Sequence, residues 1–458
     1  MAEPHTAKLI ERSHVSPPPG SVPSTSLRLT FFDLLWHLCC PVQRLYFYHF
    51  SHPTHHFLQS ILPTLKHSLS LTLQHFFPFA ANLILPPPPQ NPHILFTEGG
   101  AVDFTVTESA ADFAHLIADH SKDVLELHPF VPKLTSVRVE DNGNTRVDSL
   151  MALQVTIFPN LGISIGVTFC HLAADGRSFH QFMRSWASVF ASGCDVACIE
   201  KSPPFLNRDV IKVPIGLDPT LLKGFYEWAL KENEGPNQNQ LAGKVRSTFS
   251  LGLPQIEKLK HWINNLEPTL HLSKFVVTCA LIWVCLVKSE EIEGKIHSNN
   301  DDPYYIVFTA DCRNRLEFPI PSNYFGNCLA FCIVAVTKKD LLGPNGIFLA
   351  AKVIAKKVKD IESGALKGAE KWMAEWNKVM ESNDYVTIAG STRLGVYKTD
   401  FGWGKLKKTE SVHADVSGAI SLCDSRDDEH GVEVGLALNR NQMDRFIAIL
   451  EHKMNNIH

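Results

Sequence analysis

Hydrophobic positions along the chain alternate between the spacing of strands and the spacing of helices. Two apolar runs, Met151–Phe158 and Gly162–Cys170, are joined by a short turn and predict a pair of neighbouring strands. From Phe179 onward the apolar residues recur at spacings of three and four, which predicts one buried face of a helix. A polar turn containing His171 lies between the second run and this helix. The sequence therefore predicts a strand, a turn and a helix in succession.

The second half of the chain shows the same mixture. Its longest apolar run, Phe275–Val287, is thirteen residues long, whereas a membrane-spanning helix needs about 20. We therefore expect a buried helix here, with Ser273 as its N-cap. Because strands and helices intermix, the predicted fold class is α/β. Further strands are predicted at Tyr305–Thr309, Cys328–Thr337 and Val432–Leu438, and further helical regions at Ala350–Trp376 and Gln442–Met454.

The length of 458 residues bears on the number of domains. A single hydrophobic core rarely grows past roughly 250–300 residues, so we expect two domains. Residues 193–219 are rich in Pro, Cys and Ser and lack clear periodicity, and we interpret them as the crossover between the domains. The predicted domains are then residues 1–192 and residues 220–458.

Composition and charge narrow the class of protein. Hydrophobic residues make up 45% and charged residues 20% of the chain, as in ordinary globular proteins. With 43 Lys and Arg against 47 Asp and Glu, the net charge of −4 gives no whole-chain footprint for nucleic acid. The N-terminus lacks a signal-peptide pattern and the C-terminus lacks a lipidation signal, so we expect a cytoplasmic protein without a membrane partner. The 11 cysteines, an odd number mostly in apolar surroundings, indicate free thiols.

The segment HLAADG at 171–176 carries the sharpest candidate chemistry. A histidine at a turn after a buried strand is held in place and stays reachable, and with an ordinary pKa of about 6.5 its neutral ring can act as a general base. Asp175 allows two functional interpretations. Its carboxylate orients the ring of His171, or it turns away, caps the following helix and binds an arginine. The third interpretation is a chance spacing at a strand–helix junction.

Two further segments contain unusual residues. In DFGWG at 400–404 two glycines flank a tryptophan, which permits a tight turn or a close backbone approach. Taken alone, a packed turn is the favoured interpretation of this segment. Arg313 lies in DCRNR directly after a predicted core strand. We expect this arginine to be paired, because an unpaired buried charge is expensive.

Two motif matches are set aside. GISIG at 162–166 fits the pattern of serine hydrolases, but that pattern needs a strand–turn–helix elbow, and Ser164 lies inside an apolar run. His52, His55 and His56 lie close together, yet their spacing matches no standard zinc site. We therefore expect no metal. The Gly-rich signatures for dinucleotides and nucleoside triphosphates do not occur in the sequence.

HLAADG at 171–176 and DFGWG at 400–404, in this order, resemble the two motifs of the plant BAHD acyl-CoA-dependent acyltransferases. The likeness extends from SPPPGSVPSTSLRLTFFD near the N-terminus through HFFPFAAN to the C-terminal motif. NYFGNC at 323–328 and GSTRLGVYKTDFGWGK at 390–405 further resemble the clade of anthocyanin and flavonoid glucoside malonyltransferases.

This resemblance implies two α/β domains of the chloramphenicol-acetyltransferase type, with the active site in a channel at their interface. It implies that His171 is the general base, which takes the proton of the acceptor hydroxyl as the oxygen attacks the thioester. It gives Asp175 a structural role, in an ion pair with Arg313.

The resemblance also assigns roles in the second motif. Asp400 is counted in the family with the catalytic motif, and we expect it to act by holding the turn formed by Gly402 and Gly404. Trp403 is expected near the reacting centre, where its indole N–H could donate to the oxyanion.

The expected donor follows from the clade and from its chemistry. Malonyl-CoA, the expected co-substrate, carries a free carboxylate, and a pocket for this group needs a cation. Arg177 starts the helix beside the catalytic turn and is the expected clamp, with a solvent-exposed first-turn arginine as the alternative. The other expected donor contacts are Ser273, Lys274 and Phe275 at the start of the buried helix, and Lys258 and Lys260, which could equally form a solvated helix face.

The sequence thus predicts a monomeric acyltransferase that moves a malonyl group from malonyl-CoA to a sugar hydroxyl of a flavonoid or other phenolic glucoside. The 6-hydroxyl is the expected position, and no permanently bound cofactor is expected. The nearest alternative is the same fold with an acetyl-, hydroxycinnamoyl- or other acyl-CoA donor. A different class of alternative is a non-catalytic protein that binds acyl-CoA or phenolics, and a third alternative is a metalloenzyme.

Overall fold

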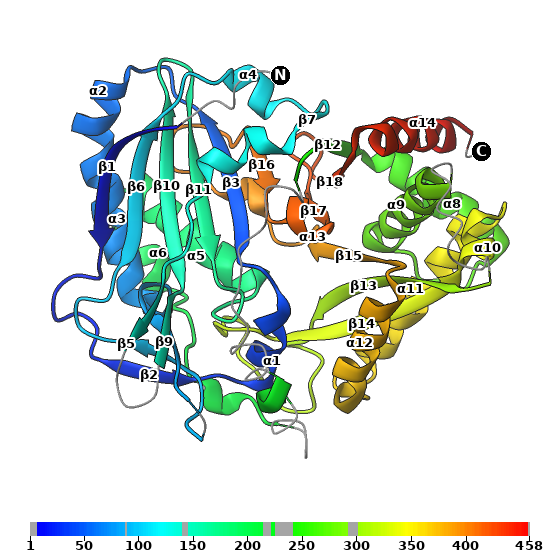
Figure 1. Ribbon diagram of the computed structural model, residues 1–458, viewed down its shortest axis with the longest axis horizontal. Helices are drawn as coiled ribbons and strands as arrows, with labels where there is room; N and C mark the ends of the chain where they lie inside the picture. Colours follow the sequence, from blue (N-terminus) through cyan, green and yellow to red (C-terminus); the bar gives the residue numbers. More distant parts are fainter. Residues whose placement is uncertain are drawn as a thin grey trace.

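The computed structural model describes residues 7–87, 89–139, 145–213, 221–224, 241–291 and 301–456. In this part of the chain the strands form three sheets, and helices pack on the two larger ones (Figure 1). The α/β class predicted from the sequence is confirmed.

The first large sheet is built mainly from the N-terminal half, in the order β1–β6–β10–β11–β3–β16. β10 and β11 are buried along their whole length, which explains why both occur in the sequence as continuous apolar runs. The helices α3 and α5 pack against each other, and the buried indole of Trp186 on α5 donates to the carbonyl of Leu65 on α3 at 3.3 Å. The bounds are β1 (Lys8–Val15), β3 (Val42–His49), β6 (Val102–Glu108), β10 (Met151–Phe158), β11 (Gly162–Phe169), β16 (Lys408–Ser411), α3 (Leu62–His75) and α5 (Gly176–Ala191).

The second large sheet belongs mainly to the C-terminal half, in the order β14–β13–β15–β17–β18–β12–β7. The helix predicted from the apolar run, α9 (Lys274–Glu291), is apolar on all sides because α8, α10, α11 and α14 pack around it. No helix of the described residues is long and apolar enough to cross a membrane. The remaining bounds are β7 (Lys122–Asp123), β12 (Lys244–Leu251), β13 (Pro303–Asp311), β14 (Leu329–Thr337), β15 (Tyr385–Gly390), β17 (Ile420–Asp424), β18 (Val432–Asn439), α8 (Leu253–Leu266), α10 (Lys338–Leu342), α11 (Gly346–Glu362), α12 (Trp372–Ser382) and α14 (Arg440–Asn456).

A third, smaller sheet lies at one end of the first (Figure 1). Its order is β2 (Thr25–Arg28), β5 (His93–Phe96), β4 (Asn82–Leu85), β9 (Thr145–Ser149) and β8 (Ser136–Val139). The short helices are α1 (Phe31–Leu34), α2 (Thr54–His56), α4 (Phe113–Ile117), α6 (Ala197–Glu200) and α13 (Ala414–Ser417).

Each large sheet takes one strand from the other half of the chain. β16 pairs with β3 in the first sheet, and β7 pairs with β12 in the second. The two halves are therefore interlocked rather than simply placed side by side. The predicted boundaries at residues 192 and 220 stay a prediction, and residues 214–220 lie outside the described residues.

The predicted helical region Ala350–Trp376 is divided in the structure. α11 ends at Glu362 and α12 begins at Trp372. Between them Gly368 adopts a φ of +83°, a left-handed conformation that glycine adopts readily, directly before a short 3-10 turn at Ala369–Lys371. The chain therefore changes direction between the two helices instead of continuing as one.

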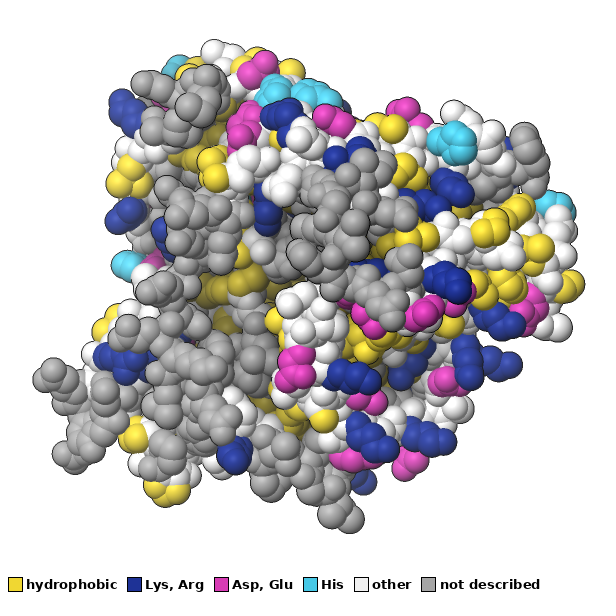
Figure 2. Space-filling model, turned by 45° about the vertical axis from the view of Figure 1, so that its right-hand side comes forward, with side chains coloured by type: hydrophobic (Ala, Val, Ile, Leu, Met, Phe, Trp, Pro, Cys, Tyr) yellow, Lys and Arg dark blue, Asp and Glu magenta, His cyan; other side chains and the backbone are white. Residues whose placement is uncertain are grey.

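Surface charge and cysteine state agree with the composition. On the face shown in Figure 2, Lys and Arg side chains are interspersed with Asp and Glu side chains. All eleven cysteines are free, which confirms the prediction of free thiols.

The two large sheets meet at a contact that we call the domain seam, formed by β3 and β16 on one side and by β12, β17 and β18 on the other. Arg246 on β12 is 1% exposed and reaches across this seam. Its guanidinium donates to Glu410 at 3.0 Å, to Asp415 at 2.8 Å and to the carbonyl of Ser411. One buried cation therefore compensates two buried carboxylates, one on the exchanged strand β16 and one shortly after it in the chain.

Removing this cation should destabilise the protein. In Arg246→Ala, Glu410 and Asp415 lose their shared partner inside the seam, and we expect a loss of about 3–5 kcal/mol in the free energy of unfolding. Urea denaturation followed by circular dichroism measures it. The exposed Arg138→Ala is the matched control and should stay within about 0.5 kcal/mol of the parent. Equal midpoints for the two variants would contradict this account of the seam.

Candidate active site

His171 lies in the turn predicted between a strand and a helix. β11 ends at Phe169, α5 begins at Gly176, and the turn is closed by a hydrogen bond from Ala173 N to Cys170 O at 3.0 Å. The side chain of His171 is half-buried, while the residues that follow it are buried. The base candidate is thus held on a rigid turn and keeps access to solvent.

Asn327, directly before β14, holds the ring of His171. Its amide nitrogen donates to Asp33 Oδ1 at 2.9 Å and to the carbonyl oxygens of His171 at 2.9 Å and Leu172 at 3.3 Å. These three acceptors identify the amide nitrogen, so Asn327 Oδ1, which lies 3.2 Å from His171 Nδ1, must accept. His171 therefore carries its proton on Nδ1, and Nε2 presents a lone pair that can take a proton from a substrate.

Asp33 on α1 is the buried anchor of this arrangement. Its Oδ2 accepts from the Oγ of Thr30 at 2.7 Å and from a guanidinium nitrogen of Arg208 at 2.5 Å. Arg208 also donates to the carbonyl of Ala173 in the catalytic turn at 3.3 Å. Three segments therefore meet at His171. They are the helix α1, the crossover segment that contains Arg208, and the residues just before β14.

An indole ring covers one face of the base. Trp36 stacks on His171 with ring centroids 3.6 Å apart and planes inclined by 10°. Burial lowers the pKa of His171 to about 4, against the opposing effects of Asp175 and Asn327. The ring is consequently neutral at physiological pH, the form that a general base needs.

Asp175 faces away from His171, as in the second of the two interpretations. Its Oδ1 caps α5 by accepting from Ser178 N at 2.9 Å. Its Oδ2 accepts from Cys328 N at 3.2 Å and forms an ion pair with Arg313 at 2.8 Å, with both side chains fully buried. Asp175 therefore joins the catalytic turn to the start of β14, and the expected ion pair is present.

The DFGWG segment forms a tight turn. Asp400 Oδ1 accepts from Gly402 N at 2.8 Å, so Asp400 holds the turn as expected. Gly402 and Gly404 have φ of +81° and +98°, which side chains rarely adopt.

The expectation that Trp403 lies near the reacting centre is wrong. Its indole packs on Phe190 at 5.1 Å and Phe50 at 6.3 Å, where α5 ends and where β11 starts. His171 follows the opposite end of β11, and eight strand residues at about 3.3 Å each separate the two by roughly 25 Å. An indole N–H at that distance cannot reach the oxyanion, and Asp400 is likewise remote from the reacting atoms.

The expected donor contacts lie in two places. Arg177 is 43% exposed and donates to Asp311 at 2.9 Å, so its guanidinium already has an anionic partner. Lys274 donates to the carbonyl of Gly431 at 3.3 Å. Their contacts with an acyl-CoA stay a prediction. Of the others, Ser273 Oγ accepts from Val276 N at 3.3 Å, Phe275 packs on Phe308 at 5.3 Å, Lys258 is exposed and Lys260 pairs with Glu257 at 2.8 Å.

The serine of the GISIG segment lies inside a strand, as the sequence indicated. Ser164 is buried in the middle of β11, without the elbow of a hydrolase nucleophile. In the residues that the structure describes, no group of three or more His, Cys, Asp or Glu side chains could hold a metal ion.

Sequence reasoning missed four residues that surround the base: Asp33, Trp36, Arg208 and Asn327. Two of them lie in segments that carried the family resemblance, Asp33 in LRLTFFD and Asn327 in NYFGNC. The available signal was a polar residue placed inside an otherwise apolar or aromatic segment, which indicates a buried and therefore partnered group.

Comparison with known proteins places the chain in a family. The family model described as "Transferase family" matches residues 8–453. Coumaroyl-CoA:anthocyanidin 3-O-glucoside-6''-O-coumaroyltransferase 1 of Arabidopsis thaliana is 41% identical over 456 residues, covering 97% of each chain. Malonyl-coenzyme A:anthocyanin 3-O-glucoside-6''-O-malonyltransferase of Dahlia pinnata is 37% identical over 451 residues, covering 96% of this chain and 95% of the relative. The crystal structure of vinorine synthase shares the fold, with a TM-score of 0.69 at 19% identity over 97% of this chain and 98% of that chain.

A neutral histidine with its Nε2 lone pair available, on this α/β scaffold and together with these matches, defines an acyl-CoA-dependent O-acyltransferase. Within that class the chain belongs to the Transferase family of plant BAHD acyltransferases. Enzymes of this family use acyl-CoA as a co-substrate.

Replacing Asn327 should slow the reaction more than it weakens substrate binding. In Asn327→Ala the ring of His171 loses the acceptor that fixes its tautomer, and we expect kcat to fall about 100-fold with little change in KM. Steady-state kinetics measures both. Asn323→Ala is the control and should keep kcat within a few fold, because this residue lies in the same motif and its side chain donates to the exposed carbonyl of Pro203. Unchanged kcat in Asn327→Ala would remove this residue from the positioning of the base.

The fall of activity at low pH should report the pKa of the buried His171 ring. Because burial lowers the pKa of His171 to about 4, the neutral base persists well below pH 6.5, and kcat/KM should fall only as the pH approaches this value. Initial rates at each pH, with circular dichroism to confirm the fold, test this. An acid limb near pH 6.5 would show that the ring titrates as an exposed histidine.

Proposed function

We propose that this enzyme transfers a malonyl group from malonyl-CoA to a sugar hydroxyl, the 6-hydroxyl, of a flavonoid or other phenolic glucoside. The observation that carries the reaction type is the free Nε2 of His171, fixed by the bond between its Nδ1 and Asn327. We further propose that the enzyme acts as a cytoplasmic monomer.

The chemical step follows from the geometry of the base. The lone pair of His171 Nε2 takes the proton of the acceptor hydroxyl while the hydroxyl oxygen attacks the thioester carbonyl carbon. The tetrahedral intermediate collapses with cleavage of the carbon–sulfur bond, and the CoA thiolate takes the proton from the imidazolium. Nδ1 keeps its proton and its bond to Asn327 throughout, so the ring does not need to turn. No acyl-enzyme is formed.

The acceptor class is supported by the names of the relatives. The Arabidopsis and Dahlia enzymes act on 3-O-glucosides at the 6'' position. Phenolic glucoside malonyltransferase 2 of Arabidopsis thaliana is 34% identical over 463 residues. Trp36 and Phe331, whose rings lie 5.7 Å apart beside the base, provide aromatic surface for a phenolic ring.

A second candidate is a coumaroyl group in place of the malonyl group. Two Arabidopsis coumaroyltransferases, at 41% and 40% identity, resemble the chain somewhat more than the Dahlia malonyltransferase at 37%. The same base and the same acceptor serve both donors. The donor pocket therefore decides between them.

A matrix of donors and acceptors tests the proposal. Malonyl-, acetyl- and coumaroyl-CoA are each offered with anthocyanidin 3-O-glucosides, simple phenolic glucosides and the matching aglycones, and products are read by mass spectrometry. We expect malonyl esters of the glucosides and none of the aglycones. His171→Ala should lower the rate about 10²–10⁴-fold without unfolding. Exclusive coumaroyl transfer would replace the donor assignment, and acylated aglycones would overturn the acceptor assignment.

A further inference from the structure

The hydrogen bond to Asn327 fixes one atom of the His171 ring but not the plane of the ring. It joins Nδ1 to Asn327 Oδ1 at 3.2 Å. An imidazole held at a single atom still tilts about its Cβ–Cγ bond, because that torsion has a broad energy minimum. Tilting changes the direction of the Nε2 lone pair. A second contact is therefore needed to aim the base.

Trp36 makes this second contact. Its indole lies parallel to the imidazole of His171, with ring centroids 3.6 Å apart and planes inclined by 10°. Phe331 on β14 packs against the same indole at 5.7 Å. The indole nitrogen is buried and has no hydrogen-bond partner among the described residues. Stacking and packing therefore hold the indole in place.

One short segment of the chain makes both contacts possible. Asp33 on α1 accepts from the amide nitrogen of Asn327 at 2.9 Å. Trp36 follows three residues later, in the 3-10 turn Leu35–Leu38. Residues three apart in such a turn project from the same face. The segment that holds Asn327 therefore also places the indole on the base.

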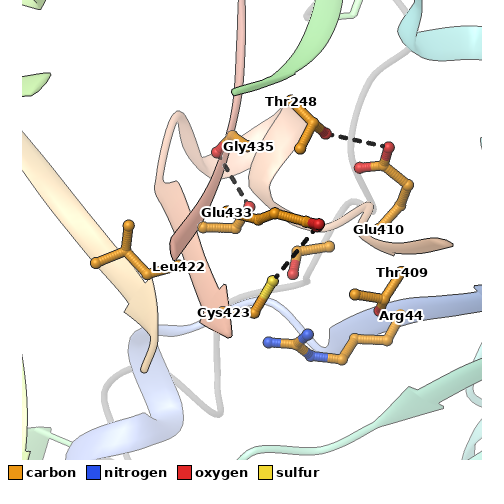
Figure 3. A pocket seen from close by; sticks show the side chains of 10 residues that line it. Arg44, Thr248, Thr409, Glu410, Leu422, Cys423, Glu433 and Gly435 are labelled. Carbon is orange, nitrogen blue, oxygen red and sulfur yellow. Dashed lines mark hydrogen bonds between the residues drawn. The ribbon is translucent and has the colours of Figure 1, made fainter. Parts of the chain in front are cut away.

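The domain seam offers little space on the neighbouring side of the site. Its pocket has a volume of about 10 Å³, room for one water molecule. Figure 3 shows side chains of both sheets around it, among them Arg44 and Glu433. His413 is close enough to Arg44 and to His171 that both contribute to its lowered pKa, after the larger effect of burial. This part of the seam thus holds no substrate, and the access of solvent to His171 depends on how the faces of its ring are covered.

Water competes with the acceptor for the same base. A neutral imidazole that deprotonates a sugar hydroxyl also deprotonates water. In that reaction the water oxygen bonds to the thioester carbonyl carbon, the carbon–sulfur bond breaks, and the CoA thiolate takes the proton from the imidazolium. The products are the free acid and CoA. An enzyme that transfers acyl groups must therefore keep water away from the base.

We propose that Trp36 is a positioning residue that directs His171 to the acceptor hydroxyl and away from water. The indole covers one face of the imidazole, so it excludes water from that face and keeps the Nε2 lone pair in one direction. This role belongs to the acyl-CoA transfer step itself. It applies equally to a malonyl and to a coumaroyl donor, and it does not depend on which of them the enzyme uses.

Hydrolysis in the absence of acceptor tests this role. Release of CoA from malonyl-CoA and from coumaroyl-CoA is followed with a thiol-reactive dye for the parent, Trp36→Leu and Trp36→Phe. We expect the parent to hydrolyse either donor at least about 100-fold more slowly than it transfers its preferred acyl group. Trp36→Leu should hydrolyse about 10–100-fold faster than the parent, and Trp36→Phe, which keeps a flat ring, should stay within a few fold.

The absolute rate of hydrolysis is the decisive quantity. Partial unfolding and weaker binding of the acceptor lower rates, so neither produces a gain in hydrolysis. Adding His171→Ala to Trp36→Leu should abolish the gain, because the base drives the reaction. Trp376→Leu is the matched control and should hydrolyse like the parent. Trp376 is half-buried like Trp36 and also packs on Phe331, at 6.4 Å, and its other ring contact in the described part of the chain is with Tyr385.

The charged groups around the ring of His171 stay in place in these variants. Asp33 and Asp175 both favour the protonated ring. Arg208 is paired with Asp33. Burial lowers the pKa of His413 to about 3, so this neighbour is neutral. A change in the pH profile of a Trp36 variant therefore reports the access of water to the ring.

The pH dependence of kcat/KM is the second readout. Burial lowers the pKa of His171 to about 4, and water that enters after removal of the indole should raise this pKa towards its ordinary value of about 6.5. The fall of kcat/KM at low pH should therefore move to higher pH in Trp36→Leu and stay near that of the parent in Trp36→Phe.

Several results would overturn the role of Trp36. They are unchanged hydrolysis or an unmoved pH profile in a folded Trp36→Leu, an equal gain of hydrolysis in Trp376→Leu, and a parent that hydrolyses its donor as fast as it transfers the acyl group. Should Trp36→Leu fail to fold, Trp36→Met, which fills the space with a flexible chain, is measured in its place against the same expectations.

Discussion

The carboxamide of Asn327 is the constraint on which the chemistry depends. Its nitrogen has three acceptors, which leaves its oxygen to face the ring of His171. An imidazole that was free to exchange tautomers would present a lone pair or a proton to the substrate by chance. Here the choice is made by a hydrogen-bond pattern that is complete before any substrate binds. The base is therefore preorganised by a neutral group, and no carboxylate in the described part of the chain hydrogen-bonds to the ring.

The charged residues around the site act on His171 indirectly, through other residues. Asp33 holds Asn327, and Asp175 holds the turn through Arg313. Both carboxylates are fully buried and both have an arginine partner. Such pairs contribute little net stability, because desolvation opposes their attraction, but breaking one is expensive. Their effect is to fix where the N-terminal and C-terminal halves meet.

The sequence predicted what depends on neighbouring residues and failed where distant segments meet. The strand, turn and helix around His171 follow from local periodicity, and the structure confirms them. Trp403 was misplaced because two motifs of one family need not share a site, and only the strand register shows that the length of β11 separates them. The partners of Asn327 lie far from it along the chain, in α1 and in the turn after β11, so its role could not be deduced from spacing.

The exchanged strand β16 has a consequence for how the protein is made. The sheet that carries His171 uses a strand from residues 408–411 as its edge beside β3. While the ribosome is still synthesising the middle of the chain, β3 has an open edge that can pair with another nascent chain. The half that carries His171 can complete its sheet only after nearly all of the polypeptide has been synthesised. A fragment that ends before β16 would therefore leave the edge of β3 unpaired and would not fold as an independent domain.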